Sequence, residues 1–556
     1  MRRFIALPFA LTLLVALAPP VFAQVPPPPP PPPLPALGAP PVPVENPQTP
    51  VKIALGQALF WDEQLSLTGT IACGTCHAPA AGGSDPRVSV NMVDSMHPGP
   101  DGVFATNDDV IGAAGVPLHA ADGSYVASSS FGMRPQVGNR QSISTINAAY
   151  PPTLFWDGRA RSNFIDPDTQ ATIIAAGGAL ESQALGPLVN TAEMAHAGGS
   201  LADMRTRIAG IEPLDLAAAV PVALANWING RRYPALFAEV FGSEIITSAR
   251  IAMAIASYER SLIANQTPHD AEQSGTPSLT PLERQGRAAY NQAGCQRCHG
   301  GALLSDNNFH YTGVRPQAAD PGRFAVTGLN QDRGRMRTPG LRNIELTAPY
   351  MADGSIATLE EVIAFYERGG DFTAPNLAPQ MTPFVLTPAQ RAALVAFLRR
   401  PLTDPRLLTQ SGPFARPTLY SESSAVPLLV GVGVAGQAGI VPRLIAIEPP
   451  LAGATNFTIA IEGAAAGANA RAILDLVEPA NANSAGVSVQ TFTVAATGNA
   501  SLHMQLPNAP VASNVDLYLR VFIEDGAAVG GFSATPSARF RVLGAATDVF
   551  VNGFEP

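Results

Sequence analysis

Charge is scarce in this sequence. Charged residues make up only 14% of its 556 residues, whereas hydrophobic residues make up 46%, and the formal net charge is −9. This excess of negative charge argues against nucleic acid as a partner and leaves no basic patch for an anionic membrane. Beyond the N-terminal segment, no apolar run qualifies as a membrane span. The length favours about three domains, which the abundant glycine and proline predict to be rich in loops.

Cysteine is also rare. The only four cysteines are Cys73, Cys76, Cys295 and Cys298. They form two Cys-x-x-Cys pairs, and each pair is followed at once by a histidine, His77 or His299. The two motifs use every cysteine, so none remains for a disulfide or for a separate zinc site.

Cys-x-x-Cys-His is the attachment motif of c-type haem, in which the two sulfur atoms bind the porphyrin and the histidine ligates the iron. A zinc cluster of the four cysteines is the alternative. Zinc does not require a histidine directly after each second cysteine. The sequence therefore predicts two covalently bound haem c groups, with His77 and His299 as iron ligands.

The N-terminus predicts export. Two arginines precede an apolar run from Phe4 to Leu17, and small residues precede Gln24, as in a signal peptide over 1–23. A retained membrane anchor is the alternative, but the run is short for a span. Since c-type haem is attached outside the cytoplasm, we expect a periplasmic protein. Residues 24–44 are mostly proline and predict an extended linker.

Two haem domains follow, which we place at 45–268 and 269–410. In each, a helical pattern precedes the haem motif and a long loop follows it, so the two domains look like an internal duplication. We expect helices at 53–60, 215–228, 234–241, 246–264, 282–290 and 388–399. Within the first domain, residues 100–109 concentrate carboxylates; they could bind calcium, although a solvated loop is the favoured interpretation.

The last part of the chain, 411–556, changes character. Short alternating or β-branched segments such as 456–462, 487–493 and 515–522 are separated by glycine, proline and asparagine. Roughly seven such strands predict an all-β immunoglobulin-like sandwich. Because it has no cysteine and its only histidine is His503, we expect docking, adhesion or spacing there rather than chemistry. The predicted fold class is thus mainly α, with two c-type cytochrome domains followed by this β-sandwich.

Several motifs between about residues 50 and 405 occur in the order found in one known family. They are Leu55–Phe60 before the first haem motif, Leu154–Ala160 containing Trp-Asp-Gly-Arg, Gln183–Met194, Thr338–Asn343, Thr347–Gly354 and Thr358–Tyr366. Together they resemble the bacterial dihaem cytochrome c peroxidase and MauG superfamily. Two departures are about seventeen extra residues before Gln183 and the long loop 88–130.

The resemblance implies roles for three residues. It makes Glu193 the distal acid–base at the His77 haem, with Gln183 as its polar neighbour, and Trp156 the electron relay between the two haems. A carboxyl group in a closed pocket should have a raised pKa, which suits a proton shuttle. The alternatives are a surface charge for Glu193 and a packing role for Trp156. The resemblance also implies a calcium ion bound by Asn147, Thr347 and Pro349, through oxygen ligands of the kind that calcium prefers.

The sixth ligand of the second haem divides the family. Tyr366 takes that position here, as in MauG-like members, whereas peroxidases of the group use a methionine, for which Met381 or Met336 is the alternative. Methionine raises the iron potential, and an anionic tyrosinate favours the higher oxidation states.

Other family histidines lack clear counterparts. Ala352 stands where most members have histidine, and Phe131-Gly-Met133 occupies the neighbourhood of the activation-loop histidine. His97 and His119 could replace it, but exposed loop histidines are the expected interpretation. His310 matches a family motif without an assigned role.

These observations predict a periplasmic dihaem peroxidase that reduces hydrogen peroxide at the His77 haem. The His299 haem would relay electrons from a small cytochrome c or cupredoxin, or store an oxidising equivalent. One alternative is MauG-like oxidation of a protein substrate. The other is a non-catalytic dihaem electron-transfer protein.

Overall fold

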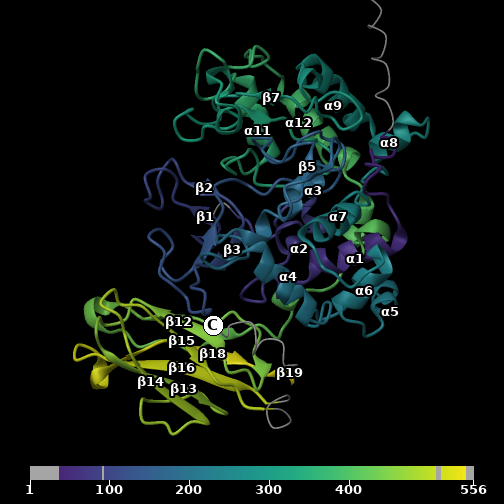
Figure 1. Ribbon diagram of the computed structural model, residues 1–556. Coiled ribbons are helices and arrows are strands. Elements are labelled where there is room, and N and C mark those ends of the chain that lie inside the picture. The colour runs from purple at the N-terminus through teal and green to yellow at the C-terminus, as the bar shows by residue number, and fades with distance from the viewer. Residues whose placement is uncertain (1–36, 90–92, 509–514, 546–556) are drawn as a thin grey trace, which may run out of the picture.

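The computed structural model describes residues 37–89, 93–508 and 515–545. The predicted signal peptide, 1–23, and most of the proline-rich linker lie outside the described residues. Within the described ranges, no helix is long and apolar enough to cross a membrane. Two largely helical domains are followed by a C-terminal region of antiparallel sheets (Figure 1).

The first domain is built on the helix pair α1 (Pro50–Trp61) and α7 (Ser248–Glu259). Thr49 and Thr247 cap these helices through their hydroxyl oxygens, and Pro50 occupies the first turn, where its missing N–H costs nothing. Between them in the sequence come α2 (Cys73–Cys76), α3 (Ala179–Ala184), α4 (Leu201–Gly210), α5 (Val222–Ile228) and α6 (Tyr233–Phe241).

The second domain repeats this arrangement with α9 (Pro281–Gln292) and α12 (Pro388–Leu398). Both begin with a threonine capping box followed by proline. Its remaining helices are α8 (Pro268–Gln273), α10 (Phe324–Thr327), α11 (Leu359–Glu367) and α13 (Pro405–Thr409).

One detail of packing is shared by the two domains. A β-carbon on Gly56 of α1 would lie 1.9 Å from the Ala254 carbonyl oxygen of α7, and one on Gly286 of α9 would lie 1.9 Å from the Ala393 carbonyl oxygen of α12. In each pair only glycine lets the helices approach so closely. The same crossing in both domains supports the internal duplication that the sequence predicted.

The expected helices are present, but two of them are shorter than predicted. The helix expected over 246–264 spans only Ser248–Glu259. Residues 215–228 were predicted as a single helix, but only 222–228 are helical. Pro221 stands directly before α5, and proline cannot continue a helix from the preceding turn because it lacks an N–H and clashes with the carbonyl four residues back. The helix therefore begins after the proline.

The long loops carry short strand pairs. In the first domain these pairs are β1 (Met96–His97) with β2 (Val110–Ile111), β3 (Ala114–Pro117) with β4 (Pro135–Val137), and β5 (Phe164–Ile165) with β6 (Thr172–Ile174). In the second domain β7 (Phe309–His310) pairs with β8 (Met336–Arg337). The β3–β4 pair belongs to the loop 88–130 and its flank, and the β5–β6 pair to the extra residues before Gln183.

The C-terminal β-domain, as we call residues 428–508 and 515–545, contains two main antiparallel sheets that share one core. The larger has the order β14-β13-β16-β18-β9 with β17 paired to β16, and the smaller has the order β10-β12-β15. The strands are β9 (Leu428–Val430), β10 (Arg443–Ile445), β11 (Leu451–Ala452), β12 (Phe457–Glu462), β13 (Asn469–Asp475), β14 (Ser488–Thr493), β15 (Ala500–Met504), β16 (Leu517–Glu524), β17 (Phe532–Ala534), β18 (Ser537–Phe540) and β19 (Leu543–Ala545). The three predicted strand segments are confirmed, whereas the immunoglobulin-like topology stays a prediction.

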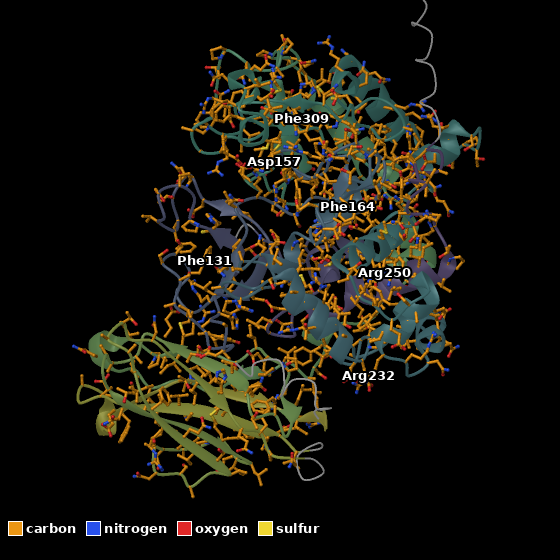
Figure 2. The ribbon with its side chains drawn as sticks, viewed as in Figure 1. Phe131, Asp157, Phe164, Arg232, Arg250 and Phe309 are labelled. Carbon is orange, nitrogen blue, oxygen red and sulfur yellow. The ribbon has the colours of Figure 1, made fainter. Side chains whose placement is uncertain are left out.

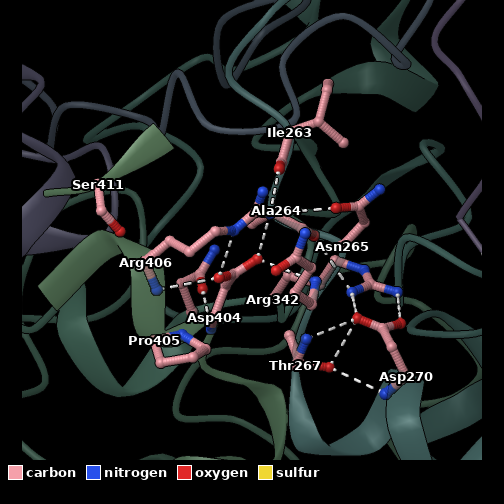
Figure 3. A network of polar contacts seen from close by, with 12 residues as sticks. Ile263, Ala264, Asn265, Thr267, Asp270, Arg342, Asp404, Pro405, Arg406 and Ser411 are labelled. Carbon is pink, nitrogen blue, oxygen red and sulfur yellow. Dashed lines mark hydrogen bonds and ion pairs between the residues drawn. The ribbon is translucent and has the colours of Figure 1, made fainter. Parts of the chain in front are cut away.

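A buried polar network joins the two haem domains (Figure 3). Within the second domain, Arg342 makes a two-pronged ion pair with Asp270, with N–O distances of 2.7 and 2.8 Å. Arg342 reaches the first domain by donating to the Ala264 carbonyl oxygen at 3.3 Å. Asp404, which is fully buried, accepts from the Gln266 backbone N–H at 2.9 Å and pairs with Arg406 at 2.7 Å. Bidentate arginine–carboxylate pairs fix orientation as well as distance, so the two pairs hold in place the side chains that bind the last residues of the first domain.

A second contact between the domains lies at the Trp-Asp-Gly-Arg motif. Phe309 of the second domain lies against the motif, because a β-carbon on Gly158, next to Asp157, would be 2.4 Å from its ring (Figure 2). Arg323 donates to the Asp157 carbonyl oxygen at 2.8 Å and stacks on the Phe309 ring. The motif is therefore held at the domain interface.

Candidate haem sites

The first haem motif forms the short helix α2, which packs against α1. The ring of Trp61 lies directly beneath Gly74, where a β-carbon would be 2.2 Å from the indole. His77 follows the helix, and its Nδ1 lies 3.0 Å from the Gly83 carbonyl oxygen. With the proton on Nδ1 donated to that carbonyl, Nε2 carries the lone pair that an iron needs. Burial lowers the pKa of His77, which keeps the imidazole neutral.

A small cavity of about 40 Å³ beside this motif brings the predicted catalytic residues together. It is lined by Cys73, Cys76 and His77, and also by Gln183 and Glu193. Gln183 reaches it from α3, which the buried Glu181–Arg260 ion pair ties to α7 at 2.7 Å. Residues more than a hundred positions apart in the sequence thus meet in one pocket.

Glu193 stands in a turn that Asn190 organises. The Asn190 side chain donates to Glu193 Oε1 at 2.8 Å and accepts from the Ala192 N–H at 2.9 Å. Burial raises the pKa of the Glu193 carboxyl, and the positive charge of Arg159 partly opposes this rise. A carboxyl group with a raised pKa beside a haem motif has the properties of a proton carrier.

The sequence analysis missed a second carboxyl group in this pocket. Glu259, at the end of α7, is 2% exposed, and its Oε2 has no hydrogen-bond partner. Burial raises its pKa to about 8, with Arg260 opposing the shift. An acidic residue on the face of a helix that otherwise buries alanine and isoleucine was the available signal.

Replacing Glu259 by glutamine is expected to change how stability depends on pH. Its pKa is about 8 in the folded protein, whereas a solvated glutamate, as in the unfolded chain, has a pKa of 4.5. Between these values the folded protein keeps a proton that the unfolded chain has lost. The free energy of unfolding therefore falls as pH rises through this window, and the variant should lack that fall. Urea unfolding of the haem-loaded proteins at about pH 5 and about pH 8 measures it. A variant whose stability relative to the natural protein is the same at both pH values would contradict the assignment.

The second haem motif follows α9 in the same way. Cys295 begins a short 3-10 turn, Cys295–Arg297, and His299 Nδ1 lies 3.1 Å from the Leu304 carbonyl oxygen. Burial lowers the pKa of His299, so the ring is neutral and its Nε2 is again the free ligand atom. None of the four cysteines forms a disulfide within the described chain, so all four are available for haem attachment.

A cavity of about 320 Å³ opens beside this second motif. Cys295, Cys298 and His299 line it, as do all three proposed sixth ligands. These are Tyr366, Met381 and Met336. Much of the remaining wall is apolar, with Leu341, Val362, Ile363 and Leu394 among its residues.

Tyr366 reaches the cavity from α11. Its ring packs edge-on against Phe365 at 5.1 Å between centroids. Among the described residues its hydroxyl has no hydrogen-bond partner, and burial raises its pKa. Met381 lies in the same wall and packs with Phe365 and Ala378. The structure brings both side chains to the cavity.

Trp156 lines the same cavity from the domain interface. Its indole N–H donates to the Gln141 carbonyl oxygen at 2.8 Å, and its own carbonyl oxygen accepts from the Arg337 N–H of the second domain at 2.7 Å. The tryptophan is thus bound to both domains and lies beside the second haem motif.

The three predicted calcium ligands also line this cavity. Asn147 is buried, and its amide pairs with the Ala264 peptide, so Oδ1 already accepts one N–H at 3.0 Å. Pro349 follows a cis peptide bond, and its carbonyl oxygen accepts from Gln141 Nε2 at 3.2 Å. The Gln141 Oε1 atom beside it is buried without a partner. Thr347 completes a group of oxygen-bearing residues, the ligand type that calcium takes.

One expectation about the loop histidines is wrong. His119 was expected to be exposed but is fully buried, with its ring against Tyr125 at 4.4 Å between centroids. It is enclosed because the loop folds back on itself: His119 and Tyr125 form a β-bridge. His97 is half-buried and its Nδ1 accepts from the Gly99 N–H at 3.1 Å. Neither histidine lines the first cavity.

The acidic loop and His310 have partners within the chain. In the acidic loop 100–109, Asp101, Asp108 and Asp109 accept backbone N–H groups of the loop itself. His310 pairs with Asp306 at 2.8 Å. With Cys298 these two form the one group of three potential metal ligands found in the described ranges, and Cys298 belongs to the haem motif.

The residues present fit two c-type haems. At each motif two thiols stand beside a neutral imidazole whose Nδ1 is fixed by a backbone carbonyl, which leaves Nε2 for the iron. A cavity lies next to each set. Two motifs in two helical domains define a dihaem c-type cytochrome.

Comparison with known proteins gives the family. Residues 50–278 match the family of di-haem cytochrome c peroxidases, and residues 284–400 match the cytochrome c family. The cytochrome-c peroxidase IdrP1 of Pseudomonas sp. strain SCT is 30% identical over 427 residues, which cover 70% of this chain and 89% of that protein. The methylamine utilization protein MauG of Methylorubrum extorquens is 28% identical over 373 residues, covering 66% and 83%. A crystal structure of a MauG-like protein associated with microbial copper homeostasis is 27% identical, covers 68% of this chain and 97% of that one, and has a TM-score of 0.49.

The chain therefore belongs to the di-haem cytochrome c peroxidase and MauG family, and it is an oxidoreductase of that family. Its two attachment motifs and the family support two haem c groups. The β-domain lies outside both matched regions.

Proposed function

We propose that this protein is a periplasmic peroxidase that reduces hydrogen peroxide at the His77 haem. The observation that carries the proposal is the first cavity. There the first haem motif lies beside the Glu193 carboxyl group, whose pKa is raised, and the Gln183 amide. Bond cleavage in peroxide needs a group that moves a proton from one oxygen to the other. Glu193 has the chemistry for that step.

A haem held by Cys73, Cys76 and His77 would supply the iron that binds and reduces the peroxide. The Glu193 carboxylate would take a proton from one oxygen of the peroxide and return it to the other, which leaves as water. Its Oε1 is held by Asn190, so Oε2 is the atom available for this transfer. The Gln183 amide would hydrogen-bond the peroxide and orient it.

The second haem would be held by Cys295, Cys298 and His299. Trp156 would connect it to the first site, because its indole lies against the second cavity and its backbone is bound to both domains. The second haem then either relays electrons or stores an oxidising equivalent.

The sixth ligand selects between two versions of this function. If Tyr366 binds the iron, the enzyme resembles MauG and passes oxidising equivalents to a protein substrate. If Met381 or Met336 binds it, electrons enter from a small cytochrome c or cupredoxin and peroxide becomes water. The position of Tyr366 supports the tyrosine version, because its side chain lines the cavity beside His299 and its hydroxyl makes no hydrogen bond to the described residues.

Calcium is part of the proposal as well. Asn147, Thr347 and Pro349 would bind the ion next to the second cavity, with further oxygen ligands from water. The orphaned Gln141 Oε1 supports a polar occupant there. We also retain as proposals the exported state, the division of the chain at 268 and 410, and the immunoglobulin-like topology of the β-domain.

Absorption spectra of the resting protein, with and without peroxide, test the function. We expect high-spin ferric absorption from an open first haem and a spectral change when peroxide is added. The non-catalytic alternative, with six ligands at both irons, predicts neither. Two low-spin haems and no response to peroxide would remove the peroxidase proposal.

A further inference from the structure

The loop insertion reaches from the first haem pocket to the β-domain. We call residues 114–137, which include β3 and β4, the bridging hairpin. Its two strands pair Ala114 with Val137 and Pro117 with Pro135. Figure 1 shows β3 between the first haem domain and strands β12 and β15 of the β-domain.

The base of the bridging hairpin lies against the peptide that carries Glu193. A β-carbon on Gly115 would be 2.0 Å from the Ala192 carbonyl oxygen and 2.7 Å from Glu193 Cα. The two backbones are therefore in direct contact, which only glycine allows. No side chain separates the hairpin from the proposed acid–base residue.

Hydrogen bonds hold this peptide on both sides of Glu193. The Gln136 side chain donates to the Thr191 carbonyl oxygen at 2.8 Å. On the other side, the Ala197 N–H donates to the His119 carbonyl oxygen at 3.0 Å. The hairpin thus binds the segment 191–197 on both sides of Glu193, while Met194 between them packs into the core of the first haem domain.

The far end of the bridging hairpin is buried against the β-domain. Tyr125 and Met133 pack with Ile445 and Ala460 in one buried cluster. The Tyr125 N–H donates to Ser501 Oγ at 2.9 Å, and its hydroxyl donates to Glu448 at 3.2 Å. The contact is apolar at its centre and hydrogen-bonded at its edge.

Strand β12 has one face toward the core of the β-domain and the opposite face toward the bridging hairpin. Its residues Phe457, Ile459 and Ile461 belong to the core of the β-domain, whereas Ala460 belongs to the cluster with the hairpin. Since successive side chains of a strand point to opposite faces, the outer face of this small sheet is what the hairpin covers. Ala460 can therefore be changed without entering the core of the β-domain.

We propose that the β-domain is a functional part of the peroxide site: through the bridging hairpin it holds Glu193 in its working position. This inference rests on the proposed role of Glu193. It replaces the expectation that the domain serves only for docking, adhesion or spacing. Ala460, Met133 and Gln136 are positioning residues in this scheme and none of them touches the substrate.

Ala460→Arg in the full-length, haem-loaded protein tests the inference. A charged side chain in the apolar cluster should push the hairpin from the β-domain and release segment 191–197. We expect amide hydrogen exchange in that segment to speed up while α7 stays protected, and kcat/KM for peroxide to fall about ten- to a hundredfold. The more solvated Glu193 should also have a lower pKa, so the fall of kcat/KM on the acid side should move to lower pH.

Two further variants complete the design. Thr493→Arg places the same side chain on an exposed edge strand of the β-domain and should leave exchange, rate and pH profile unchanged. Met133→Ala removes part of the same apolar contact from the hairpin side. We expect the same changes in exchange, rate and pH profile, but smaller ones. This variant keeps the inference testable if Ala460→Arg does not fold.

The inference is overturned if Ala460→Arg or Met133→Ala loosens the hairpin in hydrogen exchange but leaves segment 191–197 and the pH profile as they were. It is also overturned if the arginine at position 493 has the same effects as the one at position 460. Failure of the proposed function gives a different pattern: the exchange of segment 191–197 still responds, while Glu193→Gln has natural peroxide turnover.

Discussion

Replacing Glu193 by glutamine is expected to lower peroxide turnover by about two to four orders of magnitude, the usual contribution of acid–base catalysis. Glutamine has nearly the same shape and can still accept the Asn190 hydrogen bond of 2.8 Å. It cannot take up and return a proton. The loss should therefore come from the chemical step, and steady-state assays of peroxide consumption should show it in kcat as well as in kcat/KM.

The pH dependence of kcat/KM provides a second, independent test of Glu193. Since burial raises the pKa of Glu193, its working, ionised form is lost as pH falls through a value above the usual range for glutamate. The natural enzyme should lose kcat/KM on that side, and the glutamine variant should not show the same limb. Glu244→Gln, at an exposed position after α6, is the matched control and should keep natural turnover. Natural turnover in the Glu193 variant would remove this residue from the mechanism.

Replacing Tyr366 by phenylalanine is expected to change the second haem completely in near-infrared and electron paramagnetic resonance spectra, with little effect on the first haem. The phenylalanine ring keeps the packing against Phe365 and removes only the oxygen, which has no partner in the described chain. The variant also tests the chemistry, because loss of an anionic ligand should destabilise the higher oxidation states of that iron.

Met381→Leu and Met336→Leu are the matched controls, since both methionines line the same cavity. If tyrosine is the ligand, they should leave the second-haem spectrum as it is. An unchanged spectrum in the Tyr366 variant would exclude the tyrosine. A change in one methionine variant would then identify the ligand and favour electron entry from a small donor protein.

The sequence predicted those features that depend on neighbouring residues. The helices α1, α9 and α12 were found because the apolar spacing that indicates a helix acts within a few turns of the chain. The haem motifs were found for the same reason, because five consecutive residues contain the whole attachment chemistry. The duplication was visible too, and the glycine crossings at Gly56 and Gly286 agree with it.

The meeting of distant segments could not be predicted in this way. Gln183 and Glu193 were placed near His77 only by family resemblance, since spacing alone does not bring them together. Glu259 was missed because its position in the pocket depends on how α7 packs, and its helix pattern looks ordinary. His119 was misjudged because a loop residue is usually exposed, whereas here the chain folds back over it.

The sequence by itself determined that this protein carries two haems, in two helical domains, with a separate β-region after them. These properties follow from short motifs and from periodicity, which act along the chain. Only the tertiary structure decided that the β-region reaches back to the Glu193 peptide through the bridging hairpin. The reason is that this contact joins backbone and apolar surfaces more than three hundred residues apart, as in the 2.9 Å bond between Tyr125 and Ser501, and no local pattern encodes such a pairing.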